Sequence, residues 1–247
     1  MPLSRKIERD ARDYDTTQLH SSGHGRTLHR DYSAHFFRWS FARRLIKKTD
    51  EVLDIGCGVE KPLCRILFAN AMPCAKSYTG VDLNKLKPTD HQHSTLHGEF
   101  NVAERYKELL KERRGKPFDV VVHLEVIEHM KVEHGRKLLK ACHEVLKPGG
   151  LMLMSTPCYD GRRHAANHIH EYTVIELQKA VVKAGFVVVK RFGTFMDIKE
   201  LKRGDATVQD VARRLGAYFD NDALANIFGP LFPDHARNNV WVCRREK

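Results

Sequence analysis

The sequence contains no long apolar segment. Membrane-spanning helices need about 18 or more consecutive apolar residues. No such run occurs in the 247 residues, although 42% of them are hydrophobic. The start of the chain, MPLSRKIERDARDYD, is polar and lacks the apolar core of a secretory signal peptide. We therefore expect a cytoplasmic protein that does not enter a membrane.

Cysteine pairs are missing as well. The six cysteines are scattered along the chain, and no two of them form a C-x-x-C pair. This spacing argues against a zinc ribbon and against a disulfide framework, and it is typical of proteins in a reducing compartment. The sequence also has no internal repeat and no low-complexity tract. We interpret it as an ordinary globular chain.

Acidic residues are outnumbered by basic ones. The chain has 42 Lys and Arg against 31 Asp and Glu, a formal net charge of +11, and it has 15 histidines in addition. Such a surplus suits an anionic partner such as a nucleic acid or a nucleotide. However, the basic residues are spread over several segments and also fit solvated helix faces. Charge alone therefore does not decide the partner.

Short apolar runs alternate with amphipathic segments along the chain. The predicted strands are 51–58, 77–84, 118–125, 151–157, 187–192 and 239–245, and the predicted helices are 32–46, 100–115, 134–150 and 174–186. Strands that alternate with helices predict an α/β fold with a doubly wound, mostly parallel sheet. Ligands of such sheets bind at the carboxyl ends of the strands.

The first predicted strand runs into the turn VLDIGCG, which contains Asp54, Gly56 and Gly58. This is not the G-x-G-x-x-G dinucleotide motif, because the residue two positions after Gly58 is Glu60 and the turn opens with an acid. An acid at position 54 repels a pyrophosphate but suits a cationic amino acid. The second strand ends in Asp82, which is placed to accept hydrogen bonds from ribose hydroxyls.

Five segments follow one another between residues 50 and 192: VLDIGCG, YTGVDLN, FDVVVHLEVIEHM, LKPGGLMLMSTP and AGF. The ordered set resembles the signature segments of class I S-adenosylmethionine (SAM)-dependent methyltransferases. This resemblance implies a Rossmann-like, seven-stranded sheet and SAM as the cofactor. The implied cofactor contacts are the methionine part at Asp54, Gly56 and Gly58, the ribose at Asp82 and the adenine at Asn101.

We interpret the whole chain, residues 1–247, as one methyltransferase domain. Its predicted parts are an N-terminal helical cap (1–49), a SAM-binding core (50–192), a substrate-covering insertion (193–238) and a last strand (239–245). Near the end of the insertion, Arg237 and Asn238 either face the methyl acceptor or cap the last strand.

The segment HLEVIEHM, residues 123–130, contains Glu125, Glu128 and His129. Residues at spacings of three and four share one face of a helix, from which these three side chains can converge on a metal ion. The strand pattern also places Glu125 at the carboxyl end of a central strand. There it faces the methyl group of the cofactor, so we expect it at the cofactor site as well.

This segment resembles two groups of methyltransferases. The first group comprises the ubiquinone-pathway and sugar O-methyltransferases, most of which bind no metal at this segment. In the small-RNA 3′-terminal 2′-O-methyltransferases, two Glu and a His of this segment bind a divalent metal together with a second His. The stretch HAANHIHEYT, residues 164–173, offers His168 in that place.

The metal ligands implied by the second resemblance are Glu125, Glu128, His129 and His168. Such a mixed oxygen and nitrogen set suits Mg²⁺, Mn²⁺, Co²⁺ or Zn²⁺. In the metal-free group, a His at the place of His168 serves as a general base or orders its loop. His170 departs from the metal-binding pattern, which has an aromatic residue in its place, so both readings and a purely structural role stay open.

We predict an enzyme that transfers the methyl group of SAM to oxygen in preference to nitrogen, with Glu125, His129 and His168 as catalytic residues. The acceptor is expected to be polar and anionic, either a nucleotide or nucleic-acid group, or a sugar or small metabolite. The alternatives are a metal-dependent RNA ribose 2′-O-methyltransferase and a non-catalytic SAM-binding scaffold or regulatory protein. A nucleophilic Cys158, as carbon-5 pyrimidine methylation requires, is a less frequent explanation than a small buried cysteine.

Overall fold

The computed structural model describes residues 31–69, 74–88, 91–159, 161 and 166–246. The first 30 residues of the predicted N-terminal cap lie outside the described residues. None of the helices in these ranges is both long and apolar enough to cross a membrane.

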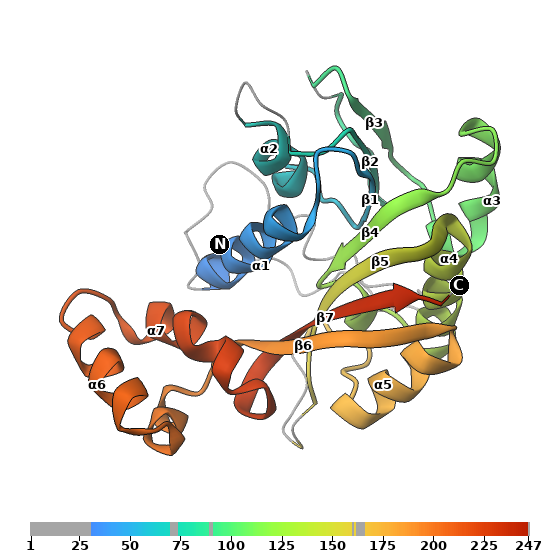
Figure 1. Ribbon diagram of the computed structural model, residues 1–247. Helices are drawn as coiled ribbons and strands as arrows, with labels where there is room; N and C mark the ends of the chain where they lie inside the picture. Colours follow the sequence, from blue (N-terminus) through green and yellow to red (C-terminus); the bar gives the residue numbers. More distant parts are fainter. Residues whose placement is uncertain (1–30, 70–73, 89–90, 160, 162–165, 247) are drawn as a thin grey trace, which may run out of the picture.

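Seven strands form a single sheet in the order β3-β2-β1-β4-β5-β7-β6 (Figure 1). Their bounds are β1 (Glu51–Ile55), β2 (Ser77–Val81), β3 (Ser94–His97), β4 (Phe118–Leu124), β5 (Leu146–Pro157), β6 (Phe186–Met196) and β7 (Ala236–Arg245). Strand β7 runs antiparallel to both of its neighbours, and the pairs among β1 to β5 are parallel. The predicted fold class, a doubly wound and mostly parallel Rossmann-like sheet of seven strands, is confirmed.

Helices cover both faces of this sheet. They are α1 (Asp31–Leu45), α2 (Pro62–Phe68), α3 (Val102–Glu112), α4 (Val132–Val145) and α5 (Val174–Lys183). Leu109, Leu139 and Val181 from α3, α4 and α5 share a core on one face, and Ala42 and Leu63 from α1 and α2 belong to a core on the other (Figure 1). Both faces are therefore buried, as continuous apolar strands require.

The connection between β6 and β7 is shorter than the predicted insertion 193–238. The two strands pair from Phe186 opposite Arg245 to Met196 opposite Ala236, with a register shift between Val188 and Lys190, so the connection spans 197–235. It contains η3 (Ile198–Arg203), α6 (Ala206–Leu215), α7 (Asn221–Phe228), η4 (Gly229–Leu231) and η5 (Pro233–His235). Its apolar residues form a third, smaller core with the end of β6.

The helix predicted over 134–150 ends earlier than expected. Helix α4 stops at Val145, and Leu146 already has an extended backbone and pairs with Phe118 of β4. Proline disfavours a helical conformation in the residue before it and lacks an amide hydrogen. Pro148 therefore keeps Lys147 out of the helix, and β5 starts at Leu146.

Candidate functional site

The turn after β1 brings the backbone close to the loop after β4. Gly56 and Gly58 have φ angles of 70° and 71°, a left-handed conformation that glycine adopts without steric penalty. A methyl group on Gly56 would lie 2.6 Å from Cγ2 of Val126, whereas one on Gly58 would meet no atom within 4 Å. The turn is thus tightly packed at Gly56 and open at Gly58, where a ligand has room.

Asp54 is a buried carboxyl group in front of this turn. The hydroxyl of Tyr78 donates a hydrogen bond of 2.6 Å to its Oδ2. Burial raises the pKa of Asp54 to about 7, and the nearby negative charge of Asp82 adds to the increase, although the bond from Tyr78 acts against it. A carboxylate that is held in this way gains stability from a cation, which fits the predicted contact with the amino-acid part of SAM.

Asp82 organises the same turn. Its Oδ2 accepts a hydrogen bond of 2.9 Å from the backbone N–H of Gly58, and its Oδ1 accepts from the backbone and the side chain of Asn84, both at 2.9 Å. A carboxylate has about four acceptor positions, so the predicted contact with ribose hydroxyls remains open to it. Glu60, in the place of a third glycine, lies at the surface and pairs with Arg65.

Asn101 begins helix α3 at the same edge of the sheet. Its side-chain oxygen accepts a hydrogen bond of 3.1 Å from the backbone N–H of Ala103 and so caps the helix. The predicted contact of Asn101 with adenine stays a prediction.

The segment HLEVIEHM does not form one helix. Strand β4 ends at Leu124, Glu125 has a φ of 57°, and only the single turn η2 (Ile127–His129) follows. The expectation that Glu125, Glu128 and His129 share a helix face is therefore wrong. A positive φ is unfavourable for a residue with a side chain and is found where the surroundings impose it, often at functional sites.

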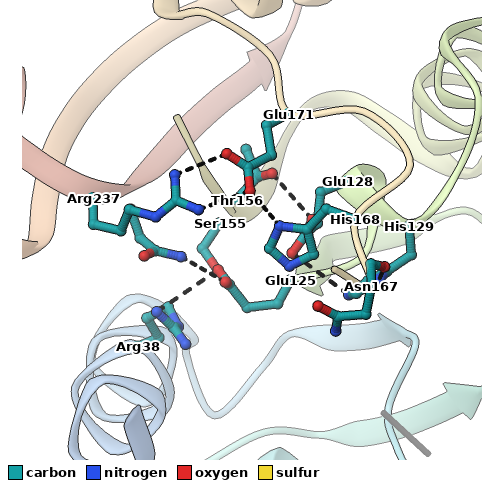
Figure 2. A network of polar contacts seen from close by, with 11 residues as sticks. Arg38, Glu125, Glu128, His129, Ser155, Thr156, Asn167, His168, Glu171 and Arg237 are labelled. Carbon is teal, nitrogen blue, oxygen red and sulfur yellow. Dashed lines mark hydrogen bonds and ion pairs between the residues drawn. The ribbon is translucent and has the colours of Figure 1, made fainter. Parts of the chain in front are cut away.

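Glu125 is bound by three neighbours from distant parts of the chain (Figure 2). Ser155 of β5 donates to its Oε1 at 2.6 Å, and Asn238 of β7 donates to its Oε2 at 2.6 Å. Nη1 of Arg38 in α1 lies 3.7 Å from Oε1. Burial acts to raise the pKa of Glu125, but the charges of Arg38 and His35 and the bond from Ser155 outweigh it, so the pKa lies below its ordinary value.

Beside Glu125, three further residues bring their ligand atoms within 4.8 Å of one another: Glu128, His129 and His168. We call these three residues the His/Glu cluster. Oε2 of the fully buried Glu128 accepts a hydrogen bond of 3.0 Å from Thr156, and its Oε1 has no hydrogen-bond partner among the described residues. Burial and the negative charge of Glu125 raise the pKa of Glu128 well above its ordinary value. This carboxyl group therefore either binds a proton or requires a cation.

Hydrogen bonds fix the tautomers of both histidines. Nδ1 of His129 lies 3.0 Å from the carbonyl oxygen of Asn167, and Nδ1 of His168 lies 2.5 Å from Oε1 of Glu171. Carbonyl and carboxylate oxygens only accept, so each Nδ1 carries the proton and each Nε2 keeps its lone pair. Glu171 is itself held by two bonds from Arg237, of 2.7 and 2.8 Å.

The structure thus gathers three of the four predicted metal ligands. Glu125 is not part of the His/Glu cluster, because its two oxygens face Ser155, Asn238 and Arg38 instead. The contributions of Arg38, Ser155 and Thr156 were not predicted. Their only sequence signal is their position, in the middle of a predicted helix and at the end of a predicted strand, because single Arg, Ser and Thr residues carry no motif.

Cys158 is buried at the end of β5. Burial raises the pKa of its thiol to about 12, and the thiol, unlike the thiolate, is a poor nucleophile. The structure therefore favours a packed cysteine over a catalytic one.

Solved structures of SAM-dependent methyltransferases are similar to this chain in fold. A SAM-dependent methyltransferase from Archaeoglobus fulgidus superposes with a TM-score of 0.57 at 17% identity over 88% of this chain and 95% of that chain. Phosphoethanolamine N-methyltransferase 2 of Haemonchus contortus, solved in complex with S-adenosyl-L-methionine, gives 0.53 at 16% identity over 85% and 52%. At this identity the likeness shows the fold alone, which is that of class I SAM-dependent methyltransferases.

A family model described as "Methyltransferase domain" matches residues 28–191, more than half of the chain. The chain belongs to this family, and SAM is its cofactor. The ubiquinone biosynthesis O-methyltransferase of Caulobacter vibrioides is 36% identical over 112 residues, which are 42% of this chain and 40% of that protein. The chain thus spans about two fifths of the length of the curated relatives it matches.

The raised pKa of Asp54 predicts a pH-dependent stability. Between about pH 4, where an aspartate ionises in the unfolded chain, and about pH 7, the folded protein retains a proton that the unfolded chain has lost. Unfolding free energy therefore decreases as pH rises through this window, by at most about 1.4 kcal/mol per pH unit. Asp54→Asn removes this contribution.

Urea denaturation of the wild type and of Asp54→Asn over this pH range measures the difference. Asp222→Asn, which changes an aspartate in α7, is the matched control and is expected to keep the wild-type slope. Equal slopes for wild type and Asp54→Asn would contradict the assignment.

Proposed function

We propose that the protein transfers the methyl group of SAM to an oxygen atom of a polar, anionic acceptor. The observation that carries this proposal is the buried His/Glu cluster together with Glu125, which Arg38 of α1 contacts. This group of side chains lies at the carboxyl ends of β4 and β5. It lies next to the glycine turn, because Gly56 packs against Val126 in the loop that carries Glu125 and Glu128. The O-methyltransferase relative supports oxygen as the acceptor atom.

The residues at the turn fit the cofactor. Asp54 offers a buried carboxylate to the amino group of SAM, and Gly58 leaves space for the chain of the ligand. Asp82, which accepts from the N–H of Gly58, is our candidate for binding the ribose hydroxyls. Bound there, SAM supplies an electrophilic methyl group on a sulfonium. The task of this chain is then to orient an acceptor hydroxyl in line with that methyl and to remove its proton.

His168 is the residue best arranged to remove the proton. Its Nδ1–H donates to Glu171, so Nε2 has the lone pair that a general base needs. When the acceptor oxygen takes the methyl group, the bond between that carbon and the sulfonium sulfur would break and leave S-adenosylhomocysteine. The hydroxyl proton would move to Nε2 of His168, and Glu171 would stabilise the resulting imidazolium. Arg38 and Glu125 border the acceptor and orient its polar groups. The guanidinium, which is only 3% exposed, has an Nε without a hydrogen-bond partner among the described residues.

Replacement of His168 tests this role. His168→Asn is expected to lower kcat for methyl transfer by about 10²- to 10⁴-fold, the usual contribution of a general base, while affinity for S-adenosylhomocysteine stays unchanged. His170→Asn, two residues away and bonded to Glu176 at 3.0 Å, is the matched control. The acceptor panel comprises nucleotides, short oligonucleotides, sugars and phenolic metabolites, with release of S-adenosylhomocysteine as the readout.

Two outcomes would count against this proposal. If cofactor binds but no acceptor releases S-adenosylhomocysteine above background, the non-catalytic scaffold is favoured. If His168→Asn retains full activity on a working acceptor, the proton acceptor is another group.

The His/Glu cluster favours a second candidate, a divalent metal that acts on a ribose 2′-hydroxyl. A buried carboxylate oxygen without a hydrogen-bond partner and two imidazoles with fixed tautomers form a donor set that suits Mn²⁺, Co²⁺ or Zn²⁺, and Mg²⁺ through the carboxylate. Glu128, His129 and His168 would hold the ion. Bound there, it would supply Lewis-acid polarisation of acceptor hydroxyls.

Metal binding is tested without any acceptor. Titration with Mn²⁺ in a calorimeter is expected to show one site, and that site is lost in Glu128→Gln and in His129→Asn. Glu133→Gln, in the first turn of α4 and largely exposed, is the matched control. Unchanged Mn²⁺ binding in both cluster variants, or methyl transfer that persists in EDTA, would contradict the metal-dependent function and favour the metal-free mechanism.

Glu171 is expected to act on the metal through His168. A carboxylate behind a ligating histidine orients the ring and increases its basicity, and its loss typically weakens metal affinity by about 10- to 100-fold. Glu171→Gln is therefore expected to weaken Mn²⁺ binding by this factor. Glu176→Gln alters the same kind of Glu–His pair outside the cluster and should leave the affinity unchanged. Equal affinities for both variants would contradict a positioning role.

A further inference from the structure

A groove separate from the His/Glu cluster lies between α1, β6 and the segment of α7 and η4. Its volume is about 690 Å³. Figure 1 shows α1 above the end of β6 and α7, which together flank this region. Phe37 and Phe41 of α1 and Phe192 of β6 line its apolar part, and Arg43, Arg44 and Lys47 line its basic part. We call it the α1 groove.

Three of the basic residues that line the α1 groove form no ion pair with an acid in the part of the chain that the structure describes. No ion pair to Arg43, Arg44 or Lys47 exists within the described ranges, and the side chain of Arg43 contacts the sulfur of Cys74 at 3.5 Å. Asp50 is nearby, but its carboxylate accepts from the backbone N–H of Lys47. The carboxylate of Asp50 thus forms no ion pair with any of these three side chains.

Some arginines on other surfaces of the molecule are paired within their own helix. Arg105 bonds Glu108 at 2.7 Å, and Arg213 bonds Asp210 at 2.7 Å. Helices α3 and α6 thus carry acids beside these arginines, which α1 does not do beside Arg43 and Arg44. The unpaired cations of the α1 groove attract an external anion.

The apolar part of the groove presents ring faces and edges. Phe41 packs edge-on against Phe192, with ring centroids 4.5 Å apart, and Phe37 remains 37% exposed. Thr194, only 2% exposed, also lines the groove, and its hydroxyl has no hydrogen-bond partner among the residues that the structure describes. An occupant therefore meets cations and aromatic rings together, with the buried hydroxyl of Thr194 behind them.

From this combination we propose that the α1 groove binds single-stranded nucleic acid. Proteins that bind single strands combine a basic groove along the phosphates with aromatic side chains against which bases stack. Arg43, Arg44 and Lys47 contact the phosphates, and bases stack on Phe37. A duplex buries its base faces, an acidic peptide lacks stacking rings, and a flat lipid surface does not enter a concave groove.

Helix α1 connects the groove with the candidate acceptor site. Arg38, which contacts Glu125, is adjacent to Phe37 in the chain and lies about 9 Å from Arg44 along the helix axis. A single-stranded nucleic acid that is bound in the groove therefore reaches the region of Glu125 within a few nucleotides. That its terminal ribose is the methyl acceptor rests on the proposed function, whereas the binding of the strand does not.

The test uses the full chain and a short fluorescein-labelled oligouridylate, with fluorescence anisotropy as the readout. Arg43→Gln/Arg44→Gln is expected to weaken binding by about 10-fold or more. Because two phosphate contacts are lost, the negative slope of log affinity against log salt concentration should become shallower by about 1.4. Phe37→Ala should weaken binding by about 5- to 100-fold without a change in that slope.

The matched control is Lys137→Gln/Lys140→Gln, which removes the same charge from the exposed side of α4. It is expected to bind the oligonucleotide like the wild type, with the same salt slope. Calorimetric binding of S-adenosylhomocysteine verifies that every variant is folded with an intact cofactor site. An oligodeoxythymidylate in parallel measures how much the ribose hydroxyls contribute.

Three results would overturn the proposal: no binding of the oligonucleotide by the wild type, an equal loss in the α4 control, or Arg43/Arg44-dependent binding of phosphatidylglycerol vesicles in place of the oligonucleotide. The proposed function fails separately. If the bound oligonucleotide receives no methyl group while another acceptor does, the groove remains a nucleic-acid site but not an acceptor channel. If no acceptor is methylated, the binding result still stands.

Discussion

Three buried carboxylates at the carboxyl ends of the central strands impose the main constraint on this structure. Glu128 and Glu171 are buried, and the side chain of Glu125 is only 12% exposed. Desolvation opposes the ionisation of Glu125 and Glu128, and the negative charge of Glu125 adds to this effect at Glu128. Each therefore needs a donor or a cation, and the central sheet alone supplies only Ser155 and Thr156. The remaining partners come from the two ends of the chain. Helix α1 supplies a guanidinium, and β7 supplies a second guanidinium and an amide.

This requirement explains why the elements outside the cofactor-binding half matter for function. The antiparallel β7 is inserted between β5 and β6, so residues more than a hundred positions away from Glu125 reach its oxygens. The cofactor turn is joined to the same loop by the close approach of Gly56 to Val126. The loop that carries Glu125 thus contacts both the glycine turn and, through Arg38, helix α1. Helix α1 also lines the α1 groove, in which we propose that single-stranded nucleic acid binds.

Local sequence rules predicted correctly where the residues proposed for the cofactor lie in the fold, whereas their contacts with SAM stay predictions. Asp54, Gly56, Gly58 and Asp82 follow strands directly, and the parallel arrangement of β1 and β2 brings the ends of both strands to one edge. The acceptor half was predicted in part. His168 joins Glu128 and His129 as expected, but Glu125 turns to other partners. The helix-face argument failed because a strand end, a residue with positive φ and a single turn place these side chains.

The sequence by itself determined the class of fold and the chemistry at the turn after β1, because alternating apolar runs, glycines and acids act over a few residues. Tertiary structure alone decided which carboxylates are neutralised, and that Oε1 of Glu128 has no hydrogen-bond partner among the described residues. It also decided that unpaired cations and aromatic rings share a groove. These properties depend on burial and on contacts between α1, β5 and β7, segments that are far apart in the chain. No local pattern of residues encodes such contacts.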